Sequence, residues 1–432
     1  MSKVIRIGEP KVLKRSLLLS NISCSRNIEK YFWRKSFWVK YDVDITGVDE
    51  SILNIPVLSN VVTVAWATGA DVYVGKLDKS YFEALENVRL VFKRWYPKLP
   101  FSTKIYVEKL VSNNFQMKNV GLLFSGGVDS FASYIKHREK KPSLIMIWGA
   151  DIPISYEDFW KKVKDYYESF ARQEIVEINF VKTNLHEFIN EGSLNVEFGR
   201  FITGSWWGGF HHGISLLGLC APLTVVKRIN RLLIASSIAP EWYAWGSHWL
   251  VDNKIRWANV KIYHDGYRLS RQKKIRKLLK EFLKNNNFQL RVCYSQFRSF
   301  NCNRCEKCRR TITALTLEGI DPNEHGFKID DDFFERLKLD ITQGHVIKDL
   351  TDFLLWRDIQ MHIPKEINHD LYNSKVFFEW FRDFNIVKSI KNLEKRFSAK
   401  WALFYVYYRS PKNLRQATAK LLRPLAKNIF PR

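Results

Sequence analysis

The sequence lacks a long apolar run near either end. The longest apolar run near its C-terminal end, residues 401–408, is far shorter than the about 20 residues that a membrane-spanning helix requires. The first ten residues mix charge and proline and contain no apolar core of a secretory signal. No internal repeat and no low-complexity linker is present. We therefore expect a cytoplasmic protein that does not act at a membrane.

Acidic residues are also scarce. The chain of 432 residues carries 44 Asp and Glu against 69 Lys and Arg, which gives a formal net charge of +25. Such an excess is typical of proteins with an anionic partner, such as a nucleic acid, a nucleotide or an acidic lipid. The alternative is a basic surface whose lysines are merely solvated. The overall charge alone does not separate these two interpretations.

Cysteine is rare and unevenly placed. The chain has six cysteines, and four of them follow the spacing C-x8-C-x2-C-x2-C: Cys293, Cys302, Cys305 and Cys308. A tight cluster in a long intracellular chain predicts a metal site rather than disulfides. Four thiolates suit a tetrahedral zinc ion. An iron–sulfur cluster, which is also held by four thiolates, and four free thiols are the alternatives.

Hydrophobic patterning divides the chain into four parts. These are an N-terminal α+β extension (1–115), an α/β domain (116–290), a four-cysteine metal module (291–311) and a helical, basic C-terminal region (312–432). In the extension we expect strands at residues 39–43, 61–66 and 72–74 and a helix at residues 81–95. In the C-terminal region we expect helices around residues 333–339, 346–356 and 376–384.

Short apolar runs alternate with helical stretches in the α/β domain. The runs are residues 120–124, 144–148, 175–181, 231–235 and 260–263. Such alternation predicts a doubly wound parallel sheet with helices on both faces. Open parallel sheets bind their ligands at the carboxyl ends of the strands.

A loop rich in glycine and serine follows the first of these strands, at residues 125–130 (Ser-Gly-Gly-Val-Asp-Ser). Gly126 and Gly127 allow backbone N–H groups to face a phosphate, and the helix that follows adds unpaired donors and a positive dipole end. Ser125 and Ser130 offer hydroxyl groups. Asp129 would repel a phosphate, so we expect it to hold the loop or to bind Mg²⁺. The alternative is a surface turn before a helix, and the absence of Gly-Lys-Ser/Thr excludes a Walker-type loop.

These six residues match the SGGxDS motif, and the chain resembles the PP-loop ATP pyrophosphatases, whose domain has a HUP-like fold. Such enzymes adenylate a substrate, release pyrophosphate, and let a nucleophile displace AMP. The resemblance implies that Ser125, Gly126, Gly127, Asp129 and Ser130 hold the β- and γ-phosphates of ATP. It further implies that backbone groups near Ile147 and Trp148 hold adenine and that Mg²⁺ takes part.

The loop and the four cysteines together, over residues 116–315, resemble the 7-cyano-7-deazaguanine synthases (QueC-like). That family adenylates 7-carboxy-7-deazaguanine and uses ammonia to make first an amide and then a nitrile. Its structural zinc follows the PP-loop domain, which favours zinc at the four cysteines here. The two long extensions resemble the QueC-like proteins of antiphage defence, including the QatC type, some of which are thought to modify a protein or a nucleic acid.

Three segments depart from that family. Asn303 stands where the family has a glycine after its second cysteine. Residues 203–209 and 246–252 replace the family's Pro-Gly-Arg-Asn and Tyr-Pro-Asp-Cys-Arg segments. The second substrate therefore has to be inferred from other residues.

Several polar residues are predicted to follow the later strands and could surround an adenylate. They are His212, Ser237, His248, Asp252, His264 and Asp265. A histidine there could act as a general base on an incoming amine. The alternative for each histidine is a helix cap or a core hydrogen bond, and either aspartate could bind metal or cap a helix.

Two basic segments could bind an anionic partner. Residues 271–284 hold seven Lys or Arg and one acid, after a plausible helix cap at Ser270. Residues 391–432 hold eleven Lys or Arg and one acid, with aromatic residues between them. Either segment could contact RNA or single-stranded DNA, or an acidic partner protein. The alternative is that each packs on the body of the protein as a helix.

The leading hypothesis is an ATP-dependent, AMP- and pyrophosphate-forming enzyme that activates a carboxylate of the 7-carboxy-7-deazaguanine type for attack by ammonia or an amine. A tRNA-modifying enzyme of the thiolase type is a second hypothesis, which the charge favours. A non-catalytic nucleotide-binding scaffold in a defence complex is a third. Retention of Asp129 argues against the third, because a scaffold has no need of it.

Overall fold

The strands of the protein join in one mixed sheet. A computed structural model describes residues 2–237 and 243–386. In it, the 12 strands follow the order β11-β12-β10-β7-β8-β9-β4-β3-β1-β5-β6, with β2 paired to β3. Their bounds are β1 (Val4–Ile7), β2 (Lys11–Leu13), β3 (Leu17–Cys24), β4 (Ser36–Tyr41), β5 (Asp71–Asp78), β6 (Ile105–Val111), β7 (Asn119–Leu123), β8 (Ser143–Trp148), β9 (Ile178–Thr183), β10 (Ile229–Ala235), β11 (Arg256–Trp257) and β12 (Val260–Asp265).

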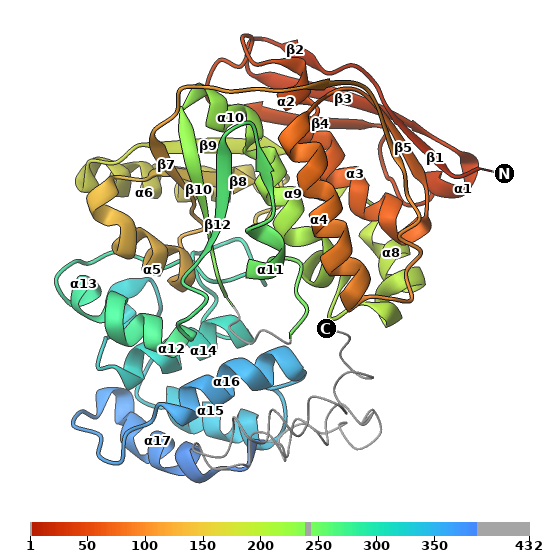
Figure 1. Ribbon diagram of the computed structural model, residues 1–432. Coiled ribbons are helices and arrows are strands. Elements are labelled where there is room, and N and C mark those ends of the chain that lie inside the picture. The colour runs from red at the N-terminus through yellow and green to blue at the C-terminus, as the bar shows by residue number, and fades with distance from the viewer. Residues whose placement is uncertain (1, 238–242, 387–432) are drawn as a thin grey trace.

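Helices surround this sheet and continue beyond it (Figure 1). Their bounds are α1 (Arg26–Glu29), α2 (Glu50–Leu53), α3 (Ile55–Thr68), α4 (Lys79–Trp95), α5 (Val128–His137), α6 (Glu157–Glu174), α7 (Leu185–Phe188), α8 (Glu191–Phe198), α9 (His212–Leu219), α10 (Ala221–Val226), α11 (Trp249–Asp252), α12 (Arg271–Lys274), α13 (Lys280–Lys284), α14 (Glu306–Leu317), α15 (Phe333–Thr342), α16 (Leu350–Met361) and α17 (Ser374–Asp383). Trp207–His211 and Ile275–Leu279 form π-helical turns.

The α/β part contains a parallel sheet, as predicted. Strands β9, β8, β7, β10 and β12 lie side by side and pair in parallel. In chain order this arrangement is 3-2-1-4-5, so the direction of winding reverses between β7 and β10. A ligand of such a sheet binds outside the carboxyl ends of the strands, at this point of reversal. The loop at residues 125–130 follows β7 and therefore lies at that point.

The N-terminal extension continues the same sheet. Strand β4 pairs antiparallel with β9, and β3, β1, β5 and β6 follow outward from it. Helix α3 packs against α9 of the α/β part, and both contribute to one hydrophobic core. Residues 1–115 and the α/β part thus share both a sheet and a core.

Both faces of the parallel sheet are buried. In β8, Leu144 and Met146 face a core that includes α5 and α6, whereas Ile145 faces the core that includes α3 and α9. Figure 1 shows these two groups of helices on either side of the sheet. Continuous apolar runs such as β8 are typical of strands covered on both faces.

Two strand predictions differ from the structure. Residues 61–66, expected to be a strand, lie inside α3, a helix whose 14 residues are all buried. A helix buried on every side loses its amphipathic period, so its run of valines looks like a strand. Residue 175, expected to open a strand, instead ends α6 in a left-handed conformation, with φ +53° at Ile175, and β9 begins at residue 178. The expected helices at residues 81–95, 333–339 and 376–384 are confirmed, and the one at 346–356 begins later, as α16.

One helical stretch of the described residues, Trp207–Val226, is long and apolar enough to cross a membrane by length and composition. However, 78% of the most apolar 18-residue window of this stretch is buried within the protein, where α9 packs against α3. Its burial is that of a core helix.

The C-terminal helices lie below the sheet in Figure 1, on the side where β10 and β12 end. Helix α14 packs on α16, and α15 packs on α17. The basic segment at 391–432 lies outside the described residues. Through α14 and α16, the C-terminal region contributes to the site at the end of the sheet.

Candidate functional site

The loop at residues 125–130 presents backbone N–H groups at the start of α5. Gly127 is the N-cap of α5, and no side chain caps this helix end. Its first N–H groups thus lack the partner that a capping side chain usually provides. The hydroxyl of Ser130 donates to the carbonyl oxygen of Gly127 over 2.9 Å, which stabilises the turn.

Gly126 and Gly127 have different roles in this turn. Gly126 has a φ of +76°, and a Cβ there would lie 1.9 Å from the hydroxyl of Tyr167. Only glycine fits that position. Gly127 has a φ of −87°, and a Cβ there would lie at an ordinary 3.5 Å from the Arg291 carbonyl oxygen and the Ser125 hydroxyl. The fold therefore requires glycine at 126, whereas at 127 a small side chain is compatible with it.

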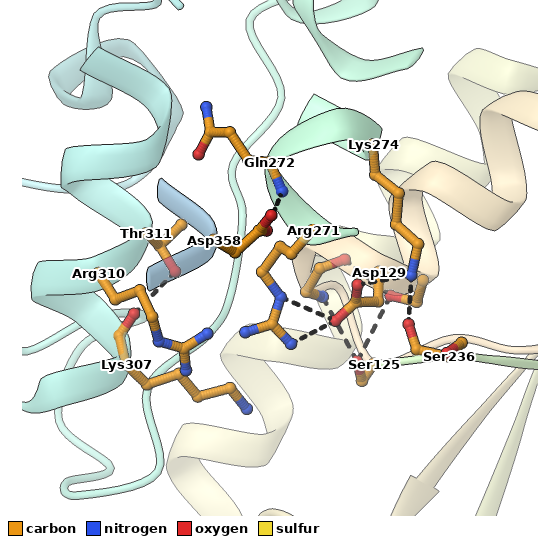
Figure 2. A network of polar contacts seen from close by, with 12 residues as sticks. Ser125, Asp129, Ser236, Arg271, Gln272, Lys274, Lys307, Arg310, Thr311 and Asp358 are labelled. Carbon is orange, nitrogen blue, oxygen red and sulfur yellow. Dashed lines mark hydrogen bonds and ion pairs between the residues drawn. The ribbon is translucent and has the colours of Figure 1, made fainter. Parts of the chain in front are cut away.

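Asp129 anchors the loop to α12. Its Oδ2 accepts hydrogen bonds from Arg271 at 2.5 and 3.1 Å, and its Oδ1 lies 3.0 Å from Lys274 Nζ (Figure 2). Lys274 Nζ also donates to the carbonyl oxygen of Ser236 at the end of β10. Burial alone would raise the pKa of Asp129, but the charges of Arg271 and Lys274 lower it to about 2. Of the two roles expected for Asp129, the geometry fits the one that holds the loop.

Helix α12 is fixed in turn by the C-terminal helices. The backbone N–H of Gln272 donates to Asp358 on α16 over 2.9 Å, and the Gln272 side chain donates to Ala314 O on α14 and to Glu318, the C-cap of α14. Ser270 caps α12, as predicted. The π-helical turn at Ile275–Leu279 follows directly, and such turns are frequent at functional sites. The helices α14 and α16 therefore position Arg271 and Lys274 over the loop.

A cavity of about 230 Å³ opens between the loop, the strand ends and α14. Its lining includes the predicted residues Ser125, Gly127, Asp129, Ser130, Ile147, His212 and Ser237. Apolar residues from β8 and β10, including Ile145, Met146 and Ile234, form part of its wall. One end of the cavity thus offers backbone N–H groups and hydroxyls, and another offers an apolar surface that could hold a base.

Three charged residues on the cavity wall were not predicted from the sequence. Asp151 follows β8, Arg291 precedes the first cysteine of the cluster, and Lys307 lies on α14. The surrounding protein opposes ionisation of Asp151, but Lys307 and Arg291 outweigh this effect and lower its pKa. In the sequence, the one indication that Arg291 and Lys307 could belong to a site is that both lie near cysteines of the cluster. A metal-binding segment that folds tightly also fixes the positions of the residues around it.

His212 and Ser237 are the two predicted substrate residues that line the cavity. Nδ1 of His212 is buried and has no hydrogen-bond partner among the described residues. Burial lowers the pKa of His212 more than Asp151 and Asp252 raise it, so its ring is neutral near pH 7 and can accept a proton. The neighbouring His211 is a core residue, bonded to Thr63 and Asn60.

The other four predicted substrate residues do not line this cavity. His264 Nδ1 lies 2.8 Å from Asp252, which also accepts a hydrogen bond from Ser247. His248 caps α11 by accepting from Leu250 N, and Asp265 pairs with Lys136 and His137. Burial opposes the charge on Asp265, but its hydrogen bonds with His137 and Lys136 lower its pKa well below the usual range. These hydrogen bonds and ion pairs of the four residues are with residues outside the cavity lining.

Backbone groups near Ile147 and Trp148 were predicted to hold adenine, and the structure shows where the side chains of these two residues lie. Ile147 lines the cavity. The Trp148 side chain stacks on Trp160, with ring centroids 5.3 Å apart, and donates to the carbonyl oxygen of Pro153. The Nζ atom of Lys182 lies 3.7 Å from the centroid of the Trp148 ring. Trp148 thus supports the end of β8 with its side chain, away from the cavity lining.

The four predicted cysteines converge on one point. Their sulfur atoms all lie within 4.8 Å of one another, with 4.0 Å between Cys293 and Cys305 and 3.9 Å between Cys302 and Cys308. Sulfurs bound at 2.3 Å to a tetrahedral ion would lie about 3.8 Å apart. The cluster could therefore hold a metal ion such as zinc.

Asn303 stands where the synthases that the sequence resembles have a glycine. It has a φ of +61°, in the left-handed region. After glycine, asparagine is among the residues that most readily adopt this conformation. The turn between Cys302 and Cys305 can therefore form without the glycine.

A larger cavity of about 870 Å³ lies beside the cysteine cluster, lined by α15 and by residues such as Asn303, Arg304 and Arg336. It contains none of the loop residues and does not reach the strand ends. The smaller cavity is the candidate site, because the loop, the strand ends and several charged side chains all meet there.

Comparisons with known proteins identify no relative of this chain. No family model and no curated protein matches its sequence, and no solved structure matches its fold. The chemistry of the site therefore has to be inferred from its own residues and their geometry.

Proposed function

We propose that this protein binds ATP in the cavity at residues 125–130, cleaves it to AMP and pyrophosphate, and thereby adenylates a carboxylate. The observation that carries the proposal is the uncapped start of α5, behind a turn that requires glycine at 126, at the reversal point of a 3-2-1-4-5 parallel sheet. Backbone donors at such a place bind phosphate groups. The SGGxDS pattern of the PP-loop enzymes supports pyrophosphate as the leaving group.

In this proposal the loop holds the β- and γ-phosphates, and the apolar wall formed by Ile145, Met146 and Ile147 receives adenine. The α-phosphate then lies between them, facing the part of the cavity lined by His212 and Ser237. Mg²⁺ would be held by the phosphates and Asp151, because both oxygens of Asp129 are taken by Arg271 and Lys274. A divalent ion there would neutralise charge on the polyphosphate.

The second substrate would bind with its carboxylate in line with the α-phosphate, and displacement of pyrophosphate would give an acyl adenylate. Ammonia or an amine would then attack the acyl carbon and release AMP. Neutral His212, with its free Nδ1, is suited to take a proton from that amine. A deazaguanine-like acid remains the candidate substrate on the QueC-like resemblance alone.

The cysteines favour this proposal over a thiolase. Cys220 is buried in the core, Cys24 lies on β3, and neither lines the cavity, while the other four cysteines form the cluster. A thiolase would need a sulfur-carrying cysteine at the cavity, or an iron–sulfur cluster at the four cysteines, which we propose hold zinc instead.

Calorimetric titration with ATP and Mg²⁺ tests the binding step. We expect ATP to bind to the wild type and not to Gly127→Val, whose branched side chain would occupy the space of the phosphates. A Gly127→Val protein that is folded and binds ATP as the wild type does would refute this site.

A further inference from the structure

Arg291 has an unusual environment for a buried cation. Its side chain lines the cavity and is part of a residue that is only 5% exposed. Its Nε and Nη2 atoms are buried and have no hydrogen-bond partner in the part of the chain that the structure describes. The described residues supply no ion pair for it either, although Asp151 is close enough for the two charges to interact. Arg291 thus lines the cavity while two of its donors lack an acceptor among the described residues.

Such an arrangement is costly for the protein alone. A guanidinium has five N–H donors, and burying it without acceptors costs several kcal/mol as an order of magnitude. Arg271, which also lines the cavity, has such acceptors, because Asp129 accepts two hydrogen bonds from it. Acceptors that residues 2–237 and 243–386 do not provide to Arg291 can come from a ligand in the cavity.

The backbone of Arg291 places its side chain beside the phosphate loop. Its N–H donates to the carbonyl oxygen of Gly126 over 2.8 Å, and its own carbonyl oxygen lies next to Gly127. Lys307 approaches the same cavity from α14. Both cations belong to the four-cysteine segment, since Arg291 is two residues before Cys293 and Lys307 lies between Cys305 and Cys308.

We infer that Arg291 and Lys307 form an oxyanion subsite for the two terminal phosphates of the nucleotide, carried to the loop by the four-cysteine segment. The planar fork of Arg291 matches two oxygens of a phosphate, and Lys307 adds a point charge. The contact of Arg291 with Gly126 assigns this subsite to the β- and γ-phosphates rather than to the second substrate. The inference depends on the proposed function only for the identity of the nucleotide.

Calorimetric titration of the full chain with inorganic pyrophosphate, ATP and AMP tests the subsite. Arg291→Gln and Lys307→Gln should each weaken pyrophosphate and ATP by roughly 10- to 100-fold, the range expected for hydrogen bonds to a charged group, and should leave AMP unchanged. Arg291→Lys, which keeps the charge but loses the fork, should recover only part of the affinity. The control is Arg298→Gln, an exposed arginine of the same segment outside the cavity lining.

Thermal unfolding without ligand separates a binding role from a structural one. Removing a buried charge without a partner should not lower the melting temperature, so Arg291→Gln should be at least as stable as the wild type. Loss of stability with unchanged pyrophosphate affinity would overturn the inference. If Arg291→Gln does not fold, the affinities of Lys307→Gln and Arg291→Lys decide the question.

The outcomes also distinguish the subsite from the proposed function. If the wild type binds pyrophosphate through Arg291 but does not bind ATP, the subsite stands and the ATP reaction is wrong. If ATP binds equally to the wild type and to Arg291→Gln, the nucleotide site stands and the subsite is wrong. A wild type that binds neither pyrophosphate nor ATP contradicts both.

Discussion

Replacing Asp129 by asparagine tests the anchor of the phosphate loop. The change keeps the shape of the side chain but leaves Arg271 and Lys274 without their shared carboxylate. All three side chains are at most 14% exposed, so solvent screens the lost charge only weakly. Removing one partner of a buried ion pair typically costs about 3 to 5 kcal/mol. The pKa of Asp129 gives a second value for this loss, because a fall from 3.8 to about 2 corresponds to roughly 2 kcal/mol of stability.

Urea unfolding followed by tryptophan fluorescence measures this loss. We expect Asp129→Asn to lower the free energy of unfolding by about 3 kcal/mol near pH 7. The matched control is Glu83→Gln, which breaks the exposed pair with Arg256, whose side chains are 47% and 50% exposed, and should cost below about 1 kcal/mol. A loss no larger than that of the control would refute the anchoring role.

The loss should also depend on pH. Because folding lowers the pKa of Asp129 from 3.8 to about 2, its ionised form contributes fully above about pH 4, and the contribution disappears as the pH falls through 2. The stability difference between the wild type and Asp129→Asn should therefore shrink over that interval. A difference that stays constant there would show that the carboxylate charge is not what stabilises the loop.

Two further predictions concern the turn and the metal. Gly126→Ala should strongly destabilise the protein, because its Cβ would overlap the Tyr167 hydroxyl in a left-handed turn, whereas Gly127→Ala should fold, which thermal unfolding of both variants would show. Elemental analysis should find about one zinc per chain, and Cys305→Ser should lower the melting temperature, because structural zinc supplies folding energy. Bound iron with a broad visible absorbance would instead show an iron–sulfur cluster.

Local patterns allowed part of the fold to be predicted. The strands β7, β8 and β10 are short apolar runs between helices, so their type and approximate position could be predicted from the sequence alone. The stretch at residues 61–66 could not, because complete burial of α3 removes the periodicity that identifies a helix. The pairing of β4 with β9, which joins the extension to the sheet, depends on contacts far apart in the chain.

Part of the candidate site could likewise be predicted from the sequence, and part could not. The loop at 125–130 and the four cysteines are contiguous motifs whose spacing carries their chemistry, and the structure brings each set together. Arg271 and Lys274 were visible only as part of a basic helix, and nothing local indicated that they would reach Asp129. Asp151, Arg291 and Lys307 meet at the cavity only through the tertiary fold.

Cleavage of ATP between its α- and β-phosphates is the reaction on which the proposed function depends. The most direct measurement incubates the protein with Mg²⁺, the small-molecule fraction of a cell extract, and ATP labelled in either the α- or the γ-phosphate. We expect labelled AMP from the first and labelled pyrophosphate from the second, and neither product from Asp129→Ala or Gly127→Val. Release of ADP and orthophosphate by the wild type would contradict the proposed function.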